Sequence, residues 1–142
     1  MPFEVETRSL DDQTTAVGAA GPYTVIIDRP AGAGGGGLGF NGGELLYLAV
    51  AGCVSNDLFR EARAAGIALR RVRVRARGDF PGNPAVSTEI TYEVDVEGDA
   101  PAERLRALVE DVDRIAEIPN SLRLGTEVRL TSIRLSTAAT PD

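Results

Sequence analysis

The longest apolar stretch of the chain predicts a buried helix. Leu45 to Val54 contains no charged residue and has no polar face when it is drawn as a helix. A surface helix carries one apolar stripe, so a helix that is apolar on all sides must be surrounded. Asn41 and Glu44 have the spacing of a capping box, and Gly66 is a typical helix stop. We therefore predict a helix from Asn41 to about residue 65, and a second copy of the chain is a natural wall for its first half.

Two stretches of alternating polarity predict a β-hairpin after this helix. From Arg71 to Arg77 every second residue is arginine, and the residues between are apolar. From Glu89 to Glu97 one face is mostly acidic and the other is apolar. A period of two is typical of half-buried strands, and the glycines and prolines between the stretches favour a chain reversal. We expect the basic and acidic faces to pair across the hairpin, which argues against a nucleic-acid interface.

The same patterns predict three further elements. A β-branched run closed by proline is typical of a strand, and apolar residues three and four apart are typical of a helix. The elements are a strand at Tyr23–Ile27, a helix that begins at Asp99 and Pro101 and ends at Pro119, and a strand at Glu127–Leu135. Residues 136–142 form a polar tail that we expect to be mobile. The whole pattern predicts a single α+β domain over residues 1–142.

A glycine-rich loop, AGAGGGGLGFNGG, covers residues 31–43. Its glycines lack the order of the phosphate-binding motifs, and the chain has no lysine for a Walker motif. We interpret the segment as a flexible loop rather than as a phosphate site.

Composition narrows the class of protein. The 142 residues are 43% hydrophobic and carry a net charge of -6, which suits one core and disfavours a nucleic-acid partner. The N-terminus has no basic and apolar leader pattern, and the longest apolar run is too short to span a bilayer. These features predict a soluble, cytoplasmic protein with no membrane partner.

The absence of certain side chains excludes several kinds of chemistry. The chain has no histidine, no lysine and a single cysteine, Cys53. Schiff bases need a lysine, and the Ser–His, Cys–His and usual zinc sites need groups that are absent. We therefore expect no metal ion and no cofactor. One cysteine cannot form a disulfide within its own chain, which fits a reducing compartment.

Cys53 itself has two interpretations. A cysteine on an apolar helix is commonly a small core residue, and apolar surroundings disfavour the reactive thiolate. Asp57 lies one turn later, and its charge would disfavour the thiolate further. The alternative is that the thiol is a nucleophile.

Several of these features together resemble the OsmC/Ohr family of small thiol peroxidases. The first half of the chain follows the pattern of that family in six successive features. They are DRP, the glycine-rich loop, FNGGELLYLAVAGC, a basic helix end, Gly66-Ile67 and an alternating strand. The acidic strand, the second helix and EIPNSL continue it, so the resemblance spans about Tyr23 to Leu135. It implies an OsmC-like fold, with antiparallel sheets wrapped around a long buried central helix. It also implies an intertwined homodimer with sites at the subunit interface.

The resemblance implies a mechanism as well. In the peroxidases of the family an organic hydroperoxide oxidises a first cysteine, and a second cysteine just before a proline resolves it as a disulfide. An arginine and a glutamate position the first thiolate. Cys53 matches the first cysteine, but Ile118 stands at the position of the second, so an internal disulfide step is unavailable.

The glutamate and the arginine are matched less directly. The peroxidases carry the glutamate ten residues before the cysteine, at Gly43 here, whereas other members carry it nine before, as Glu44 does. Nine residues are two and a half helical turns, so Glu44 lies on the opposite face from Cys53 and about 13 Å away along the axis. Glu44 is then either a cap or part of the site of the partner chain. Arg8 and Arg29 are the candidate arginines.

Two functions remain from the sequence. The first is an OsmC-like protein of stress or detoxification type that reduces organic hydroperoxides with Cys53, Glu44 and an external thiol. The alternative is a non-catalytic dimer that binds a small apolar or thiol-reactive ligand at the subunit interface.

Overall fold

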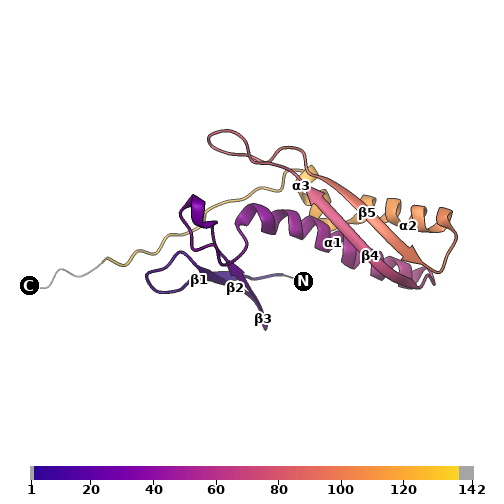
Figure 1. Cartoon of the computed structure of the whole chain (residues 1–142), viewed down its shortest axis with the longest axis horizontal. Coiled ribbons are helices and arrows are strands. Elements are labelled where there is room, and N and C mark those ends of the chain that lie inside the picture. The colour runs from indigo at the N-terminus through magenta and orange to yellow at the C-terminus, as the bar shows by residue number, and fades with distance from the viewer. Residues whose placement is uncertain (1, 138–142) are drawn as a thin grey trace, which may run out of the picture.

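In the computed structural model, which describes residues 2–137, the strands and helices form an α+β arrangement around one long helix, α1 (Gly42–Ala64) (Figure 1). The strands form two antiparallel sheets, one of order β1-β2-β3 and one made of β4 and β5. The predicted class is therefore confirmed. The other elements are β1 (Glu6–Ser9), β2 (Ala16–Ala20), β3 (Tyr23–Ile27), a 3-10 turn (Ala31–Ala33), β4 (Leu69–Arg77), β5 (Thr91–Gly98), α2 (Ala102–Ile115) and α3 (Glu117–Arg123).

The ends of α1 are where the sequence predicts them. The backbone N–H of Glu44 donates to Asn41 Oδ1 at 2.9 Å, and the N–H of Asn41 donates to Glu44 Oε1 at 3.0 Å. This capping box satisfies two of the free donors at the helix start. Gly66 follows the C-cap with φ of 70°, a left-handed conformation that glycine adopts without steric cost.

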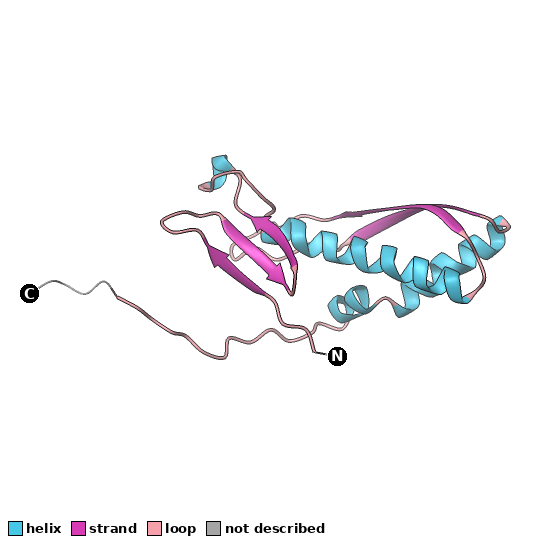
Figure 2. Cartoon of the chain, turned by 90° about the horizontal axis from the view of Figure 1, so that it is seen from below, coloured by secondary structure: helices cyan, strands magenta, loops and turns pink. Residues whose placement is uncertain are grey.

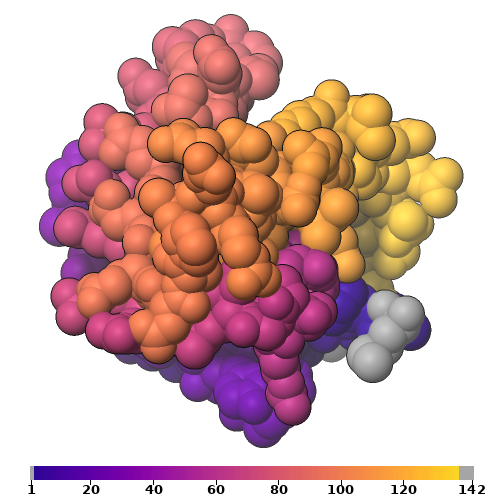
Figure 3. All heavy atoms as spheres, turned by 90° about the vertical axis from the view of Figure 1, so that its right-hand side faces the viewer, coloured from indigo at the N-terminus to yellow at the C-terminus, as the bar shows by residue number. Residues whose placement is uncertain are grey.

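One side of α1 forms the core. The β4–β5 hairpin lies along the helical layer, and the three-stranded sheet lies beyond the N-terminal end of α1 (Figure 2). Seen end-on, α2 covers this core, and the C-terminal segment stands at one side (Figure 3). The buried core consists of Val54, Leu58, Ala62, Ile67, Leu108, Val112 and Ala116.

The opposite side of α1 is not covered within one chain. Leu48 is 49% exposed and Phe59 is 48% exposed, and Gly52 between them is exposed too. The expectation that Leu45–Val54 is surrounded is therefore met on one side only. Nothing in the described part of the chain supplies the second wall.

The hairpin has the predicted polarity and pairing. Val72 pairs with Val96 and Val74 pairs with Val94, and Val72, Val74 and Val94 pack against the core. On the outer face Arg75 lies 3.2 Å from Glu93, and longer ion pairs join other arginines to the acids of β5. The cross-strand pairing that we predicted is therefore confirmed. Exposed pairs of this kind contribute about 0–1 kcal/mol each, so their main effect is to balance the charge of the face.

The end of the second helix differs from the prediction. α2 ends at Ile115, Ala116 is extended, and a separate helix, α3, begins at Glu117. Pro119 therefore does not end a helix but lies in the first turn of α3. Proline is tolerated there because the first N–H groups of a helix have no intrahelical partner.

The predicted last strand is wrong for the single chain. Residues 126–137 carry no regular secondary structure and extend away from the helices (Figure 1). A strand needs a neighbour to pair with its backbone groups, and no strand of the described chain lies beside this segment. Of the predicted tail, residues 138–142 lie outside the described residues. Exposed apolar side chains along the segment are Val128, Leu130, Ile133 and Leu135.

The glycine-rich loop is held to β3 by one carboxylate. Asp28 is 3% exposed, and both of its oxygens accept hydrogen bonds. The donors are the hydroxyls of Thr14 (3.0 Å) and Thr15 (2.8 Å) and the backbone N–H groups of Arg29, Gly36 and Leu38. The Thr15 hydroxyl is the largest cause that lowers the pKa of Asp28 to about 2. The loop that we interpreted as flexible thus turns its amides toward an anion supplied by the chain itself.

We predict that Asp28→Asn destabilises the protein in a pH-dependent way. The pKa of Asp28 is lower in the folded chain, about 2, than its ordinary value of 3.8. Its ionised form therefore adds stability that is fully present above about pH 4 and is lost as the pH falls toward 2. The free energy of unfolding, measured in urea, should be much lower for Asp28→Asn than for the native chain at neutral pH. This difference should shrink as the pH falls toward 2. A difference that stays constant over this range would contradict the prediction.

We also predict that the arginine face does not bind duplex DNA. Its charges are paired with the acids of β5, so few phosphate contacts could release counterions. Fluorescence anisotropy with a labelled duplex should show no binding at micromolar protein and physiological salt. A tight, strongly salt-dependent interaction would refute this interpretation.

Candidate functional site

Cys53 lies at the border between the buried and exposed sides of α1. It is half-buried, has a free thiol and packs against the core cluster. Val50, one turn before it, and Asp57, one turn after it, are both buried. The thiol is thus accessible from one side and held by packing on the other.

Asp57 is the polar neighbour of this cysteine. It is 7% exposed, and its Oδ1 atom lies 3.2 Å from Arg60 Nη1. Its Oδ2 atom has no hydrogen-bond partner, and within residues 2–137 it is the one buried side-chain oxygen or nitrogen in that state. Arg60 also donates from Nε to Glu61, and Glu61 first and then Asp57 raise the pKa of Arg60.

The other predicted site residues do not meet Cys53 within the chain. Glu44 is engaged in the capping box described above. Arg8 is exposed and pairs with Glu6 at 3.4 Å. Arg29 lines a cavity of about 750 Å³ at the N-terminal end of α1, together with Gly43 and Phe80. Ten residues separate Gly43 from Cys53, or about 15 Å along the helix axis.

The position ten residues before Cys53 is closed to a side chain. The ring of Phe80 stacks on Tyr47 with ring centroids 5.5 Å apart and planes 14° apart. A Cβ atom on Gly43 would come within 2.7 Å of Phe80 Cε2. Phe80 therefore occupies the space where the peroxidases' glutamate would begin.

The position expected for a second thiol is apolar. Ile118 is half-buried near the start of α3, and α3 packs against α1. Since Cys53 is the single cysteine of the sequence, no second thiol exists in the chain to resolve an oxidised Cys53.

A cavity of about 480 Å³ lies beside the Cys53 turn of α1. Val50, three residues before Cys53, forms part of its apolar lining. Its other walls come from α3, from β5 and from the segment that leads into β5, so no local pattern in the sequence predicts it. The lining residues are Leu46, Val50, Ser87, Thr88, Glu89, Ile90, Tyr92, Pro119, Leu122 and Arg123.

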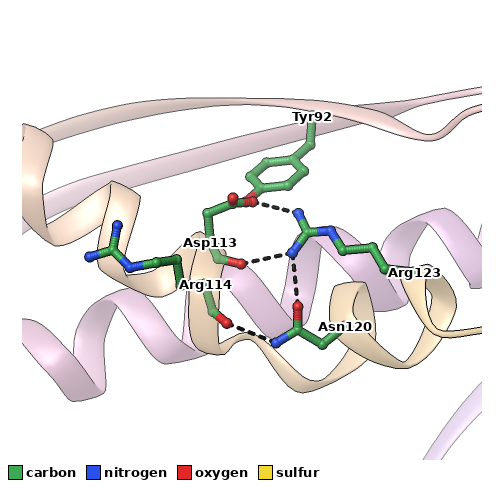
Figure 4. A network of polar contacts seen from close by, with 5 residues as sticks. All are labelled: Tyr92, Asp113, Arg114, Asn120 and Arg123. Carbon is green, nitrogen blue, oxygen red and sulfur yellow. Dashed lines mark hydrogen bonds and ion pairs between the residues drawn. The ribbon is translucent and has the colours of Figure 1, made fainter.

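A hydrogen-bond network forms the polar wall of this cavity (Figure 4). The Tyr92 hydroxyl donates to Asp113 Oδ1, and Arg123 donates to the same oxygen at 2.7 Å. The Tyr92 and Arg123 hydrogen bonds lower the pKa of Asp113, while burial, followed by Asp113, raises the pKa of Tyr92 to about 12. Arg123 also donates to Asn120 Oδ1 at 2.9 Å. The network joins β5, α2 and α3, and sequence analysis missed it because its members are far apart in the chain.

The described residues contain neither a group of candidate metal ligands nor a candidate membrane-spanning helix. Among residues 2–137, no three histidine, cysteine, aspartate or glutamate residues are grouped so that they could hold a metal ion. None of the helices there is long and apolar enough to cross a bilayer.

Several solved structures share this fold. An OsmC-like protein from Mycoplasma pneumoniae is 16% identical, with a TM-score of 0.74 over 87% of this chain and 88% of that one. A putative organic hydroperoxide resistance protein from Vibrio cholerae, with captopril bound in one of its active sites, is 20% identical, with a TM-score of 0.63 over 87% and 85%. The organic hydroperoxide resistance protein OhrB of Bacillus subtilis is 18% identical, with a TM-score of 0.59 over 87% and 91%.

At these identities the structural likeness establishes the fold alone, and no curated protein matches the sequence significantly. The match of the sequence to a protein family is stronger evidence of family membership than the structural likeness. Residues 34–131, which include α1, the hairpin, α2 and α3, match the family described as OsmC-like protein. The chain therefore belongs to the OsmC-like protein family.

Proposed function

We propose that this protein is a one-cysteine organic hydroperoxide reductase that uses Cys53 and an external thiol. Family membership supports a stress-related role, and several structural neighbours are named for organic hydroperoxide resistance. The observation that carries the proposal is the position of Cys53, half-buried on α1 and one turn from Val50, which lines a cavity of about 480 Å³ with both apolar and polar walls. A cavity of that size fits a small organic hydroperoxide.

The chemistry needs only groups that the chain or the medium supplies. The sulfur of Cys53 attacks the distal oxygen of the hydroperoxide, an S–O bond forms, and the O–O bond breaks. The departing alkoxide takes up the proton of the thiol and leaves as an alcohol. Cys53 becomes a sulfenic acid, which an external thiol reduces through a mixed disulfide and a second thiol exchange. The absence of a second cysteine makes this external reductant necessary.

Charge near Cys53 is partly balanced within α1. Asp57 by itself would oppose a thiolate, but Arg60 pairs with it at 3.2 Å and offsets its charge. The participation of Glu44, Arg8 or Arg29 stays a prediction, because none of them reaches Cys53 of its own chain. A cytoplasmic location stays a prediction as well.

We further propose that the working form is a homodimer. The exposed side of α1, with Leu48 and Phe59, and the unpaired C-terminal segment both present apolar surface to solvent. Large apolar patches of this kind mark protein interfaces. A second copy would provide the missing wall of α1, and its strands could pair with residues 126–137.

The dimer proposal predicts that Leu48→Asp prevents assembly. An unpaired charge buried in an apolar interface costs a few kcal/mol, so the variant should lose the soluble dimer. Sedimentation or light scattering at micromolar concentration should give a dimer for the native chain. Replacement of exposed Glu103 by alanine is a suitable control, because this residue lies in the first turn of α2 and not on the exposed side of α1. A folded native monomer under these conditions would overturn the proposal.

The reductase proposal predicts the products of oxidation. One equivalent of an organic hydroperoxide should convert Cys53 into a sulfenic acid that dimedone traps, and no intramolecular disulfide can form. Turnover should require an added thiol, and Cys53→Ser should abolish it without changing the oligomeric state. Mass spectrometry and a coupled alcohol assay give these readouts. A Cys53 that resists hydroperoxide in the folded protein and reacts only after unfolding would eliminate the reductase.

That last outcome would favour the second candidate function, a non-catalytic dimer that binds a small apolar or thiol-reactive ligand. The cavity beside Val50 supports this alternative, as does the Vibrio cholerae neighbour, which has captopril bound in one of its active sites. Its test is binding of small apolar thiols by calorimetry, which Cys53→Ser would leave largely intact.

A further inference from the structure

Asp57 Oδ2 is a buried acceptor for which the folded chain provides no donor. Buried polar atoms in proteins are nearly always hydrogen-bonded, and an exception calls for a specific explanation. Asp57 is 7% exposed, and its other oxygen is already paired with Arg60. The question is which donor completes this carboxylate.

Helix geometry places Asp57 and Cys53 on the same face of α1, one turn apart. Side chains on a helix lean toward the N-terminus and cover the residues three and four positions earlier. For Asp57 these residues are Val54, which has no polar group, and Cys53. Arg60 lies on the C-terminal side of Asp57 and takes Oδ1. Cys53 is therefore the polar side chain of α1 that lies one turn before Asp57 on the same face.

The exposed side of α1 points away from this oxygen. Leu48 precedes Asp57 by nine residues, or two and a half turns, and Phe59 follows it by two residues, a little over half a turn. Both exposed residues are thus on the face opposite Asp57. A second chain packed on Leu48 and Phe59 would lie on the opposite side of α1 from Asp57.

The reduced thiol does not satisfy Oδ2, since this atom has no partner when Cys53 is reduced. An oxygen added to the sulfur moves the donor one bond farther out. We propose that Asp57 Oδ2 accepts the hydrogen bond of the Cys53 sulfenic acid and so holds it in the neutral, protonated form. This inference rests on the proposed function, because it assigns a role in the oxidised state that the reductase cycle creates.

The consequence is resistance to a second oxidation. A sulfenate anion attacks another hydroperoxide, a second S–O bond forms, the O–O bond breaks, and a sulfinic acid and an alcohol result. The sulfinic acid is not reduced by ordinary thiols. A hydrogen bond that only the protonated sulfenic acid can donate disfavours the anion. In a chain with no second cysteine, the sulfenic acid must persist until an external thiol arrives, so this protection preserves the catalyst.

Few other charges face this turn of α1. On α1 itself they are Arg60 and Glu61, and on α3 Glu117 acts on Arg60. From β5 the titratable inward group is Tyr92, which is bonded to Asp113 of α2 and Arg123 of α3. The arginines of β4 and the acids of β5 lie on the outer face of the hairpin.

The test follows the second oxidation separately from the first. The full chain is converted to the sulfenic acid with one equivalent of tert-butyl hydroperoxide, and sulfinic acid formation in excess hydroperoxide is measured by mass spectrometry. Asp57→Asn and Asp57→Ala should form sulfinic acid roughly tenfold faster, as expected for the loss of one hydrogen bond to a charged group. The pH at which the rate of sulfinic acid formation reaches half its maximum should be about one unit lower in these variants than in the native chain.

Glu61→Gln is the matched control. It removes a carboxylate that also pairs with Arg60, at 2.9 Å, but it lies eight residues after Cys53 and should match the native chain. A measurement without substitution gives an independent check, because the pH midpoint of the second oxidation should be higher in the folded native chain than in urea. Equal rates in native and Asp57 variants, or equal midpoints in folded and unfolded native chain, would overturn the inference.

Failure of the proposed function gives a different result. A native chain that forms the sulfenic acid but is not turned over by any thiol would refute the reductase and leave the role of Asp57 standing. A native chain whose Cys53 never forms a sulfenic acid would overturn both.

Discussion

The structure depends on the burial of one side of α1. Val54, Leu58 and Ala62 lie on that side, and the hairpin and α2 reach the core through contacts with it. Burial of apolar surface contributes roughly 25 cal/mol per Å² and is the main source of folding stability. The exposed side of the same helix contributes little of this burial energy within one chain. Leu48 and Phe59 on that exposed side are the apolar surface that the proposed homodimer would bury.

Two buried aspartates show opposite uses of a carboxylate. Asp28 has its oxygens filled by hydroxyl and amide donors, and its effect is to fix the glycine-rich loop against β3. Asp57 keeps one oxygen without a donor, one turn from the single thiol. A satisfied buried carboxylate stabilises the fold, whereas an unsatisfied one costs free energy and calls for a specific explanation.

The parts of the fold that follow from local sequence were predictable. The Asn41–Glu44 capping box, the Gly66 stop and the alternation of the hairpin strands each involve residues close together in the chain. The prediction that a helix ends at Pro119 was wrong because proline is compatible with the first turn of a helix as well as with a helix end. The last strand failed for another reason, since alternation in residues 127–135 describes a strand but cannot supply its neighbour. The cavity and the network of Tyr92, Asp113 and Arg123 depend on tertiary contacts that no local pattern carries.

The site was predictable to a similar extent. Cys53 and Asp57 are four residues apart, so their juxtaposition follows from helix geometry alone. That Asp57 is buried, and that one of its oxygens lacks a donor, depends on how α3 and the core pack around it. Glu44 matched both a family position and a capping box by spacing, and the structure shows the capping bonds.

The stacking of Phe80 on Tyr47 over Gly43 limits how this sequence can change. The ring fills the space that a side chain at this position would need, so a glutamate introduced there alone would collide with it. Conversion to the carboxylate arrangement of the two-cysteine peroxidases would require the Phe80 ring to move or to be replaced. The two positions are 37 residues apart in the chain, from Gly43 to Phe80, yet a side chain at one acts directly on the other. A glutamate at position 43 would thus also disturb the stacking of Phe80 on Tyr47.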